Sequence, residues 1–503
     1  MPSSFSYGMS VVNAVSDVVP TERIDIVGRR PLAWWPVGLI AAGATLLLLI
    51  TANRYDYHRD ELYFRMLGQH PQWGYVDQPP FTPLLARLGI EFFGDTVWGM
   101  RVPFALVLGL TALVAAVIAR EVGGGAVAQS IAAAGVVSAF PLSAAHVSST
   151  AAVDLLVWLG VVFFVIRALQ GSSQGWVWAG VTAGAGLYNK HLVVLLLVSL
   201  AVGLLVAGPR PVFRSRMLWM GVAAVVVVGL PNVVYQVVHG FPQVQMTSVI
   251  AVSGAERLMV VPLQFVLIVL PPVWIAGIVM LARDRRLRSI AVAYPVLLIL
   301  VLVSGGQAYY PVGLLLALFA VGAVPTTRWM TRRWRQVFLW TGVAVSALVA
   351  VVSGLPAIPE EDLGDSFVVA VNQTVADQIG WREYVWQVGA VYAGLSDADQ
   401  RKTVLFAGNY GEAGALDRYG PSLALPDVYS GHNSLFDLGP PPKGKSVVVA
   451  VVETAPRELG NCAVKARLHN SVGVENEELS SQVYVCRLSQ PWSSVWPGLK
   501  HYG

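Results

Sequence analysis

The sequence predicts an α-helical protein with many membrane spans and a small α/β domain at its carboxyl end. Hydrophobic residues make up 55% of the 503 residues, charged residues make up only 13%, and long apolar runs recur as far as about residue 355. In a soluble domain, roughly a quarter of the residues are charged. This chain therefore has too few polar side chains to cover a water-soluble surface, and the lipid bilayer is its expected solvent.

About eleven apolar segments qualify as spans, although some are shorter than the roughly 20 residues that a straight span needs. They are residues 32–50, 101–119, 125–143, 153–169, 176–189, 191–207, 217–236, 259–281, 289–303, 307–324 and 337–355. The two segments that meet at Asn189 and Lys190 are the weakest of the set. They fit two short helices that meet near the outer surface.

The arginines between the spans indicate the orientation. With eleven spans, all the arginine clusters fall on one side, and the positive-inside rule makes that side cytoplasmic. The clusters are Arg23, Arg29 and Arg30; Arg120; Arg210, Arg214 and Arg216; Arg283, Arg285, Arg286 and Arg288; and Arg328, Arg332, Arg333 and Arg335. The net charge of +4 thus reflects topology and does not indicate nucleic-acid binding. We expect a multi-pass protein of the cytoplasmic membrane.

This orientation divides the chain into three parts. Residues 1–31 form a cytoplasmic segment without a cleavable signal peptide. Residues 32–355 form the membrane domain, with a long outer loop at 51–100, and residues 356–503 form a domain outside the cytoplasm. The expected elements of the last part are a helical stretch at Val368–Leu395, strands at Thr403–Ala407, Ser446–Val452 and Val483–Cys486, and a helix at Ala413–Tyr419.

Cys462 and Cys486 are the two cysteines of the chain, and both lie in this last part. Outside the cytoplasm two such thiols are able to pair. A disulfide and two unrelated buried thiols both remain open at this stage.

The first outer loop carries an adjacent carboxylate pair, Asp60 and Glu61, within the aromatic stretch Tyr55–Phe64. One carboxylate is able to accept a proton from a hydroxyl nucleophile as a general base. Both together are able to hold a divalent cation beside a phosphate leaving group. The alternative is a solvated loop with interfacial aromatic residues. Further candidates in this loop are His58, Arg59, Tyr75, Asp77 and Gln78.

Three other positions add chemistry on the same expected face. Asp154 lies at the mouth of an apolar helix, where an ionisable group is costly and marks a functional site by default. Its structural alternative is a carboxylate that offsets the helix dipole. Lys190 and His191 lie where two apolar segments meet and are able to hold a lipid phosphate, although Lys190 also fits a snorkelling side chain. Tyr309 and Tyr310 add hydroxyl groups between two late spans.

Taken together, the motifs at 60–64 and 74–80, then Asp154, then Gly186–Lys190, then 309–311, resemble the GT-C glycosyltransferases. The closest similarity is to the bacterial relatives of the protein O-mannosyltransferases and to the lipid A aminoarabinose transferases. The resemblance covers roughly residues 32–325, and its most specific part is the first-loop motif. Residues 408–419 and 429–433 also look like the soluble domain of some bacterial members.

The resemblance implies an enzyme that transfers a sugar from a polyprenyl-phosphate carrier to an acceptor outside the cytoplasm, usually with inversion. It assigns Asp60 as the base, Glu61 as its support and Asp154 as the second acidic group. Lys190 is then the contact of the carrier phosphate, with His191, Tyr309 and Tyr310 beside it. Because the leaving group is already a phosphate, the protein must chiefly activate a hydroxyl and neutralise negative charge.

The chain departs from this pattern at Asp77 and Gln78, where the aminoarabinose transferases tend to carry a basic residue before the two prolines. Whether a divalent cation is needed stays open, because no unambiguous metal-ligand spacing is present. In the last part of the chain, the candidates for binding a carbohydrate acceptor are Asn409, Tyr410, Glu412, His432 and Asn433. Ordinary turn chemistry is the alternative for these residues.

Two other functional classes compete with the transferase. A transporter or flippase also has many spans and buried charges, but here the acidic residues gather at one face and no internal repeat is visible. The other class is a non-catalytic assembly subunit with an extracellular binding domain. The carboxylate pair argues against it, because such a subunit does not need one. The expected partners are membrane lipids, the lipid-linked sugar and a glycan, lipid or protein acceptor. The sequence does not identify the sugar, the carrier, the acceptor or the oligomeric state.

Overall fold

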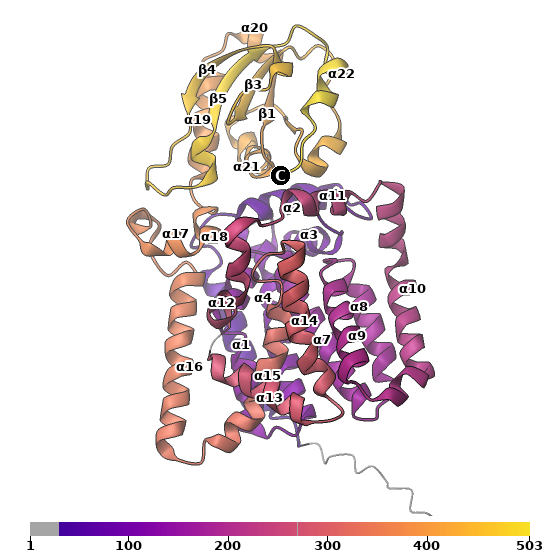
Figure 1. The fold of residues 1–503 in the computed structure, drawn as a ribbon. Coiled ribbons are helices and arrows are strands. Elements are labelled where there is room, and N and C mark those ends of the chain that lie inside the picture. Colours follow the sequence, from indigo (N-terminus) through magenta and orange to yellow (C-terminus); the bar gives the residue numbers. More distant parts are fainter. Residues whose placement is uncertain (1–29, 269) are drawn as a thin grey trace, which may run out of the picture.

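The computed structural model describes residues 30–268 and 270–503, and it shows two stacked parts (Figure 1). A bundle of helices, α1 to α16, forms the first part. A five-stranded sheet with flanking helices, reached through α17 and α18, forms the second. The cytoplasmic segment predicted at 1–31 lies almost wholly outside the described residues.

The apolar runs of the sequence fold as helices, since a helix satisfies all its backbone hydrogen bonds within one segment. The bundle contains α1 (Trp34–Thr51), α2 (Arg59–Gln69), α3 (Phe81–Phe93), α4 (Val97–Glu121), α5 (Ala126–Ala134), α6 (Ala139–His146), α7 (Thr150–Leu169), α8 (Gly175–Gly186), α9 (Val193–Ala207), α10 (Arg216–Val238), α11 (Pro242–Val249), α12 (Val260–Leu267), α13 (Pro271–Arg283), α14 (Arg288–Ser304), α15 (Val312–Trp329) and α16 (Arg333–Gly354).

Within the described residues, six of these helices are long and apolar enough to cross a membrane. Two bent helix pairs raise this number to eight if each pair is one span, and α9, α13 and α14 are shorter apolar helices. A multi-pass helical architecture is therefore confirmed. The predicted count of eleven spans is not confirmed.

Two predicted spans are wrong as single helices. Segment 259–281 contains α12 and α13, separated by a break before Pro271. Proline lacks an amide proton and forces the preceding residue out of the helical region, so the tandem Pro271–Pro272 starts a new helix. Segment 125–143 contains α5 and α6, which bend by 59°. At that bend the Ser138 hydroxyl donates to the Gly135 carbonyl at 2.6 Å and satisfies an acceptor that the break leaves free.

Within the described residues, the connections α4–α5, α9–α10, α13–α14 and α15–α16, which carry arginines, lie at the end of the bundle away from the sheet (Figure 1). Two hydrogen bonds tie these connections together. The Arg120 guanidinium donates to the Arg30 carbonyl, and the Arg288 guanidinium donates to the Ala207 carbonyl, each at 2.7 Å. The arginine-rich end and the sheet-bearing end are thus opposite faces of one bundle.

The predicted first outer loop is largely helical, because it contains both α2 and α3. A capping box begins α2: the His58 side chain accepts a backbone N–H of the first turn, and the Glu61 side chain accepts the His58 N–H. This arrangement satisfies amide groups that a helix start otherwise leaves unpaired. It also places Asp60 and Glu61 in one rigid helical turn, where consecutive side chains point in different directions.

The sheet has the strand order β2-β1-β3-β5-β4. The strands β1 (Thr403–Ala407), β2 (Val428–Ser430) and β3 (Val447–Val452) are parallel neighbours, whereas β5 (Gln482–Arg487) runs antiparallel between β3 and β4 (Asn461–Arg467). Cys462 and Cys486 face each other across β4 and β5 and form a disulfide. Of the two alternatives for the cysteines, the paired one is therefore present.

Helices cover both faces of this sheet. Side chains of α19 (Trp381–Ala393) and α21 (Tyr410–Tyr419) pack on one face, and α22 (Trp492–Val495) packs on the other. The helix predicted at Val368–Leu395 is wrong as one element, because it is divided into α17 (Phe367–Val371), α18 (Gln373–Ala376) and α19. A turn with Gly380 at φ +92° separates the last two, and glycine takes this left-handed conformation without steric cost.

The sheet-bearing part, which we call the C-terminal unit, rests directly on the first loop. Helix α21 packs against α2. Gly414 of α21 meets the backbone of Leu62 so closely that a side chain larger than hydrogen would clash. Arg65 of α2 bridges Asp95 at 2.7 Å and Asp417 of α21 at 2.5 Å. The two parts are therefore joined at the helix that carries Asp60.

Candidate active site

Asp60 lies in the first turn of α2, at the level where the bundle meets the C-terminal unit. Its side chain is 39% exposed. The Tyr410 hydroxyl donates to Asp60 Oδ1 at 2.9 Å, and Asp60 Oδ2 lies 3.9 Å from His58 Nδ1. Asp60 also lines a cavity of about 670 Å³. Its carboxylate is therefore accessible and oriented.

Glu61 lies on a different side of α2 and is fully buried. Arg101 of α4 donates to both of its carboxylate oxygens, at 2.9 and 2.6 Å, and Arg101 is itself 2% exposed. The Glu61 carboxylate also accepts the His58 N–H at 2.8 Å. A buried charge is tolerable only when it is paired and hydrogen-bonded in this way. Glu61 therefore holds α2 against α4 and does not reach the cavity.

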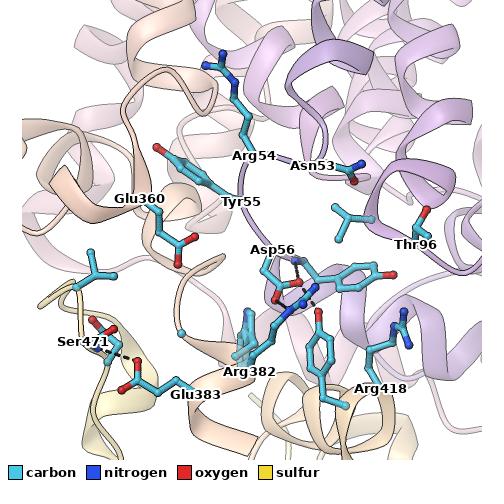
Figure 2. A pocket seen from close by; sticks show the side chains of 17 residues that line it. Asn53, Arg54, Tyr55, Asp56, Thr96, Glu360, Arg382, Glu383, Arg418 and Ser471 are labelled. Carbon is cyan, nitrogen blue, oxygen red and sulfur yellow. Dashed lines mark hydrogen bonds and ion pairs between the residues drawn. The ribbon is translucent and has the colours of Figure 1, made fainter. Parts of the chain in front are cut away.

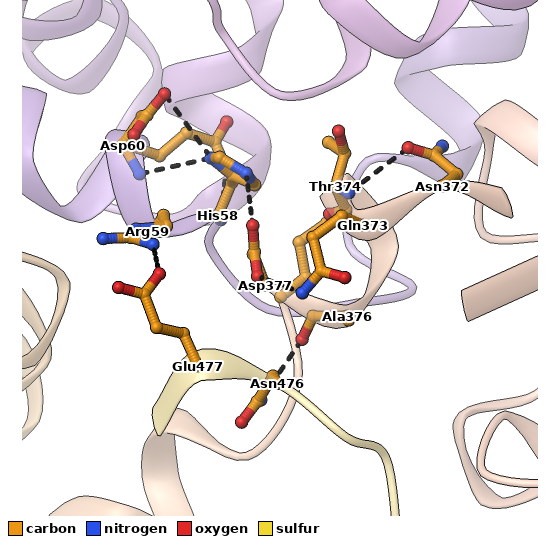
Figure 3. A network of polar contacts seen from close by, with 12 residues as sticks. His58, Arg59, Asp60, Asn372, Gln373, Thr374, Ala376, Asp377, Asn476 and Glu477 are labelled. Atoms are coloured by element: carbon orange, nitrogen blue, oxygen red, sulfur yellow. Dashed lines mark hydrogen bonds and ion pairs between the residues drawn. The ribbon is translucent and has the colours of Figure 1, made fainter. Parts of the chain in front are cut away.

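His58 bridges Asp60 and a distant carboxylate, Asp377 (Figure 3). His58 Nδ1 accepts the Asp60 amide at 3.2 Å, and His58 Nε2 lies 3.5 Å from Asp377 Oδ2. Burial opposes a charge on this ring, but the hydrogen bond to Asp377 and the nearby carboxylates raise the pKa of His58 overall. The ring therefore links the start of α2 to Asp377 through its two nitrogen atoms.

Asp154, Lys190, Tyr309 and Tyr310 form a second group of polar residues near Asp60. Asp154 of α7 is buried, and its Oδ1 has no hydrogen-bond partner among the residues that the structure describes. Lys190 Nζ lies 3.5 Å from the Tyr309 hydroxyl and 5.1 and 5.3 Å from the ring centres of Tyr309 and Tyr310. No carboxylate of the described chain lies within 4.0 Å of that ammonium group. We call these four residues and Asp60 the membrane-face cluster.

Lys190 is placed by the turn between α8 and α9. Its neighbour Asn189 is buried, accepts the Thr82 hydroxyl at 2.8 Å and donates to the Thr150 carbonyl at 2.9 Å. These bonds tie the turn to α3 and to the start of α7, which carries Asp154. His191 points elsewhere, because its Nε2 lies 2.6 Å from Asn232 Oδ1 of α10. The structure therefore brings Lys190 to the cluster and leaves His191 at its edge.

The cavity beside Asp60 has mainly apolar walls that come from the bundle. Its lining includes His58 and Asp60 at one end, Tyr309 and Gln307, and residues of α6, α12, α16 and α17. Phe140 of α6 stacks on Tyr309 with ring centres 4.9 Å apart. The cavity thus joins an apolar surface to the Asp60 carboxylate and to the hydroxyl that contacts Lys190.

The remaining first-loop candidates have structural contacts. The Tyr75 hydroxyl donates to the Leu67 carbonyl at 3.0 Å, and the Tyr75 amide donates to the Gln78 carbonyl at 2.8 Å. Asp77 accepts the Tyr63 hydroxyl at 3.1 Å, and burial raises the pKa of Asp77 to about 7. Arg59 pairs with Glu477 of the C-terminal unit. None of these four candidates lines the cavity beside Asp60.

A separate polar cavity of about 590 Å³ lies between the first loop and the C-terminal unit (Figure 2). Asp56 is its central carboxylate. Arg382 lies 3.3 Å from one oxygen of Asp56, and the Tyr419 hydroxyl donates to the other. Asp56 is therefore already paired, in contrast to Asp60, which is only four residues away.

The acceptor candidates of the C-terminal unit fall into two places. Asn409 and Glu412 line a crevice of about 550 Å³ beyond the carboxyl ends of β1 and β3, which is the position that ligands favour in α/β sheets. Tyr410 and His432 instead stack on each other, with ring centres 5.0 Å apart, towards α2. Asn433 is buried, and its backbone N–H donates to the His501 carbonyl.

Glu412, which lines this crevice, lies beside a second acidic residue, Glu478. Glu412 caps α21 by accepting the backbone N–H groups of Gly408 and Asn409, and Asn409 Nδ2 donates to Glu478 at 3.2 Å. Both carboxyl groups are buried. Burial raises the pKa of each group, and for Glu478 the negative charge of Glu412 adds to the effect. We call Asn409, Glu412 and Glu478 the crevice cluster.

No group of three or more side chains suited to hold a metal ion occurs in the part of the chain that the structure describes. Three residues of the site were missed from the sequence: Arg101, Asp377 and, as a contact of Asp60, Tyr410. Arg101 carried a signal, since an arginine at the start of an apolar run is costly and indicates a partner. Asp377 and Tyr410 carried none, because they reach the site only through the tertiary fold.

Comparison with known proteins agrees with this architecture. Residues 77–235 match the family model described as dolichyl-phosphate-mannose-protein mannosyltransferase. The fold is similar to that of ArnT from Cupriavidus metallidurans bound to undecaprenyl phosphate, with a TM-score of 0.57 and 17% identity, over 91% of this chain and 99% of that one. The apo structure of the same protein gives a TM-score of 0.56 and 17% identity, over 90% and 98% of the two chains.

A third similarity is to the oligosaccharyltransferase AglB from Archaeoglobus fulgidus, with a TM-score of 0.43 and 13% identity over 77% of this chain and 63% of that one. A TM-score this low supports no inference. No curated protein matches the chain. The partial family match and the whole-chain likeness to ArnT confirm the resemblance predicted from the motifs: the chain has the fold of the GT-C glycosyltransferases, a group of multi-pass membrane proteins.

Proposed function

We propose that this protein transfers a sugar from a polyprenyl-phosphate carrier to a hydroxyl group of an acceptor, with Asp60 as the general base. The observation that carries the proposal is the position of Asp60. It is the accessible member of a carboxylate pair, and it lines a largely apolar cavity together with Tyr309, whose hydroxyl lies 3.5 Å from Lys190 Nζ. Among the described residues, no carboxylate lies within 4.0 Å of that lysine. A lipid-linked phosphate needs both an apolar surface and a cation.

In the proposed reaction, the acceptor hydroxyl gives its proton to Asp60 as its oxygen bonds to the anomeric carbon of the sugar. The bond between that carbon and the phosphate oxygen breaks, and polyprenyl phosphate leaves with the electron pair. Lys190 and the Tyr309 hydroxyl stabilise the negative charge on the leaving phosphate. A single displacement of this kind inverts the anomeric carbon. Asp154, whose charge interacts with that of Lys190, is the second acidic group of the proposed site.

The chemistry of the neighbours supports a lipid-phosphate donor. One of the two similar ArnT structures has undecaprenyl phosphate bound, and the family that matches residues 77–235 is named for a dolichyl-phosphate sugar. The arginine-rich end of the bundle is opposite the cluster. By the positive-inside rule, we therefore propose that the cluster and the C-terminal unit face outward from the cytoplasmic membrane. Both oxygens of Glu61 already accept from Arg101, so the Asp60–Glu61 pair considered from the sequence is not free to hold a divalent cation. A metal requirement of the reaction is a further element to test.

The test uses the purified full-length protein in lipid nanodiscs. Undecaprenyl phosphates that carry different radiolabelled sugars are offered with envelope extract from cells that lack the protein. The proposal predicts that label moves from the organic to the glycan or lipid-product fraction with at least one donor, and that chelation with EDTA reports any metal requirement. Uptake of the labelled donor into sealed vesicles without a glycosylated product contradicts the proposal and favours a transporter.

A further inference from the structure

Tyr410, the first residue of α21, reaches from the C-terminal unit to the proposed base. Its hydroxyl donates to Asp60 Oδ1 at 2.9 Å, although the two residues are 350 positions apart in the chain. Burial, together with the nearby charge of Asp60, raises the pKa of Tyr410 well above its ordinary value. The hydroxyl therefore keeps its proton and acts as a hydrogen-bond donor to the carboxylate at neutral pH.

The Tyr410 ring is held from several sides. It stacks on Tyr63 of α2 with ring centres 4.7 Å apart and on His432 at 5.0 Å, and the Arg59 guanidinium lies 4.9 Å from its centre. The Tyr410 amide donates to His432 Nδ1 at 3.1 Å. Burial lowers the pKa of His432 to about 3, so this imidazole stays neutral and accepts that bond. The direction of the hydroxyl is thus determined by packing.

The fold of the C-terminal unit sets this position. Tyr410 follows the capped turn that ends β1, and α21 then runs along α2. The close approach of Gly414 to Leu62 and the ion pair between Arg65 and Asp417 fix the register of the two helices. A shift of α21 by one residue removes the tyrosine from Asp60.

The hydrogen bond divides the roles of the two oxygens of Asp60. Tyr410 occupies Oδ1, whereas Oδ2 lies towards His58 and is left to accept a proton. The other titratable groups whose charge interacts with Asp60 are His58 and Arg59 of the same helix start, Asp77 of the first loop and Tyr309 of the α14–α15 loop. In the described structure, none of these four groups has a hydrogen bond from its side chain to the Asp60 carboxylate, whereas Tyr410 does.

We propose that Tyr410 is a positioning residue for the general base, so that the active site is complete only when the C-terminal unit is docked on α2. This inference rests on the proposed function and deepens it. A bond from a neutral donor to a carboxylate orients the group and favours its charged form. The C-terminal unit then acts directly on the chemistry of the membrane domain, in addition to any contact it makes with an acceptor.

The test is Tyr410→Phe, which keeps the stacked ring and removes the hydroxyl. Because one hydrogen bond to a charged acceptor is lost, we expect kcat to fall by about tenfold to a hundredfold, with KM for the lipid-linked donor within about twofold of the original value. The acidic limb of the pH–rate profile moves to higher pH, because the lost bond favoured the charged carboxylate. Tyr484→Phe is the matched control, because Tyr484 lies on the sheet face that packs against α22, and we expect it to change nothing.

A second readout needs no substrate. Labelling of Asp60 by a water-soluble carbodiimide, followed by peptide mass spectrometry across a pH series, reports when the carboxyl group is protonated. In Tyr410→Phe we expect the midpoint of this labelling to move to higher pH. An unchanged kcat and labelling midpoint, in a protein that Asp60→Asn still inactivates, overturns the role of Tyr410 alone. An altered midpoint with no transferase activity in the unaltered protein upholds the contact and instead counts against the proposed function.

Discussion

The membrane-face cluster and the crevice cluster both contain acidic side chains near the junction of α2 and α21. They differ in how accessible these side chains are and in whether the charged groups already have partners. In the membrane-face cluster, Asp60 is accessible, and the Lys190 ammonium has no carboxylate within 4.0 Å among the described residues. In the crevice cluster, Glu412 and Glu478 lie buried beside each other, and N–H groups of the same unit donate to Glu412 Oε2 and to Glu478 Oε2. On our proposal, the accessible charge of the membrane-face cluster, and not its number of acidic groups, suits it to catalysis.

The same contrast separates two neighbouring residues. Asp60 and Glu61 are adjacent in α2, but only Glu61 enters a buried ion pair, with Arg101. If the contrast is correct, a change at Glu61 acts on stability and a change at Asp60 acts on catalysis.

The largest expected effect on stability is that of Glu61→Gln. Removing one partner of a buried pair leaves the Arg101 charge without compensation, which costs about 3–5 kcal/mol. We expect a strong fall in the yield of monodisperse protein and in its unfolding temperature in detergent. The control is Glu91→Gln, which removes the exposed pair with Arg87 and costs at most about 1 kcal/mol. Equal unfolding temperatures for the two variants contradict the structural role of Glu61.

Much of the site was predictable from residue chemistry, but its division of labour was not. The carboxylate pair, Asp154 and Lys190 stand out because polar groups are costly next to apolar runs. The different directions of Asp60 and Glu61 depend on where α2 begins, and the partner of Glu61 lies 40 residues away in α4. Tyr410 and Asp377 lie more than 300 residues from their contacts in α2, and no local pattern reports such pairings.

The fold was predictable to a similar degree. The apolar runs and the α/β character of the C-terminal unit follow from local periodicity. The helix breaks at Ser138 and Pro271 have local causes, a serine-to-carbonyl hydrogen bond and a tandem proline, which the apolar runs used to predict the spans did not register. Strand β4 was missed, and its exposed pattern explains why, since most of its side chains face away from the core.

A second, smaller effect is expected at Lys190. Lys190→Ala removes the cation that we propose to meet the donor phosphate, and we expect the affinity for undecaprenyl phosphate alone to fall by about tenfold, which corresponds to about 1.4 kcal/mol. Binding is measured by native mass spectrometry or by the rise in unfolding temperature with added lipid. The control is Lys443→Ala, since Lys443 is exposed in the C-terminal unit. If both variants bind the lipid as the original protein does, Lys190 is not a phosphate contact.

The smallest effect on catalysis is expected in the crevice cluster. Glu478→Gln should leave transfer within about twofold while changing how stability depends on pH. Both carboxyl groups have a raised pKa in the folded protein, so the folded state binds protons more tightly than the unfolded state. The stability that they contribute is present at low pH and is lost as pH rises from the ordinary carboxyl range, roughly 4.3, through the raised values.

We therefore expect the unfolding temperature of Glu478→Gln to fall less between pH 6 and pH 9 than that of the original protein. Differential scanning fluorimetry in detergent measures this difference. A large loss of transfer in this variant would instead assign the crevice to the acceptor, in line with the prediction for Asn409 and Glu412, and would remove the contrast between the two clusters.

The most direct test of the central claim is the rate of sugar transfer by purified Asp60→Asn in nanodiscs, measured with the donor found active for the original protein. Asparagine keeps the size of the side chain and its contact with Tyr410 but is not able to take up the proton. We predict a loss of about 10²- to 10⁴-fold in kcat, with an unchanged unfolding temperature and unchanged undecaprenyl phosphate binding. Asp397→Asn, at an exposed position of the C-terminal unit, should retain full activity. Transfer by Asp60→Asn at the original rate would contradict the account.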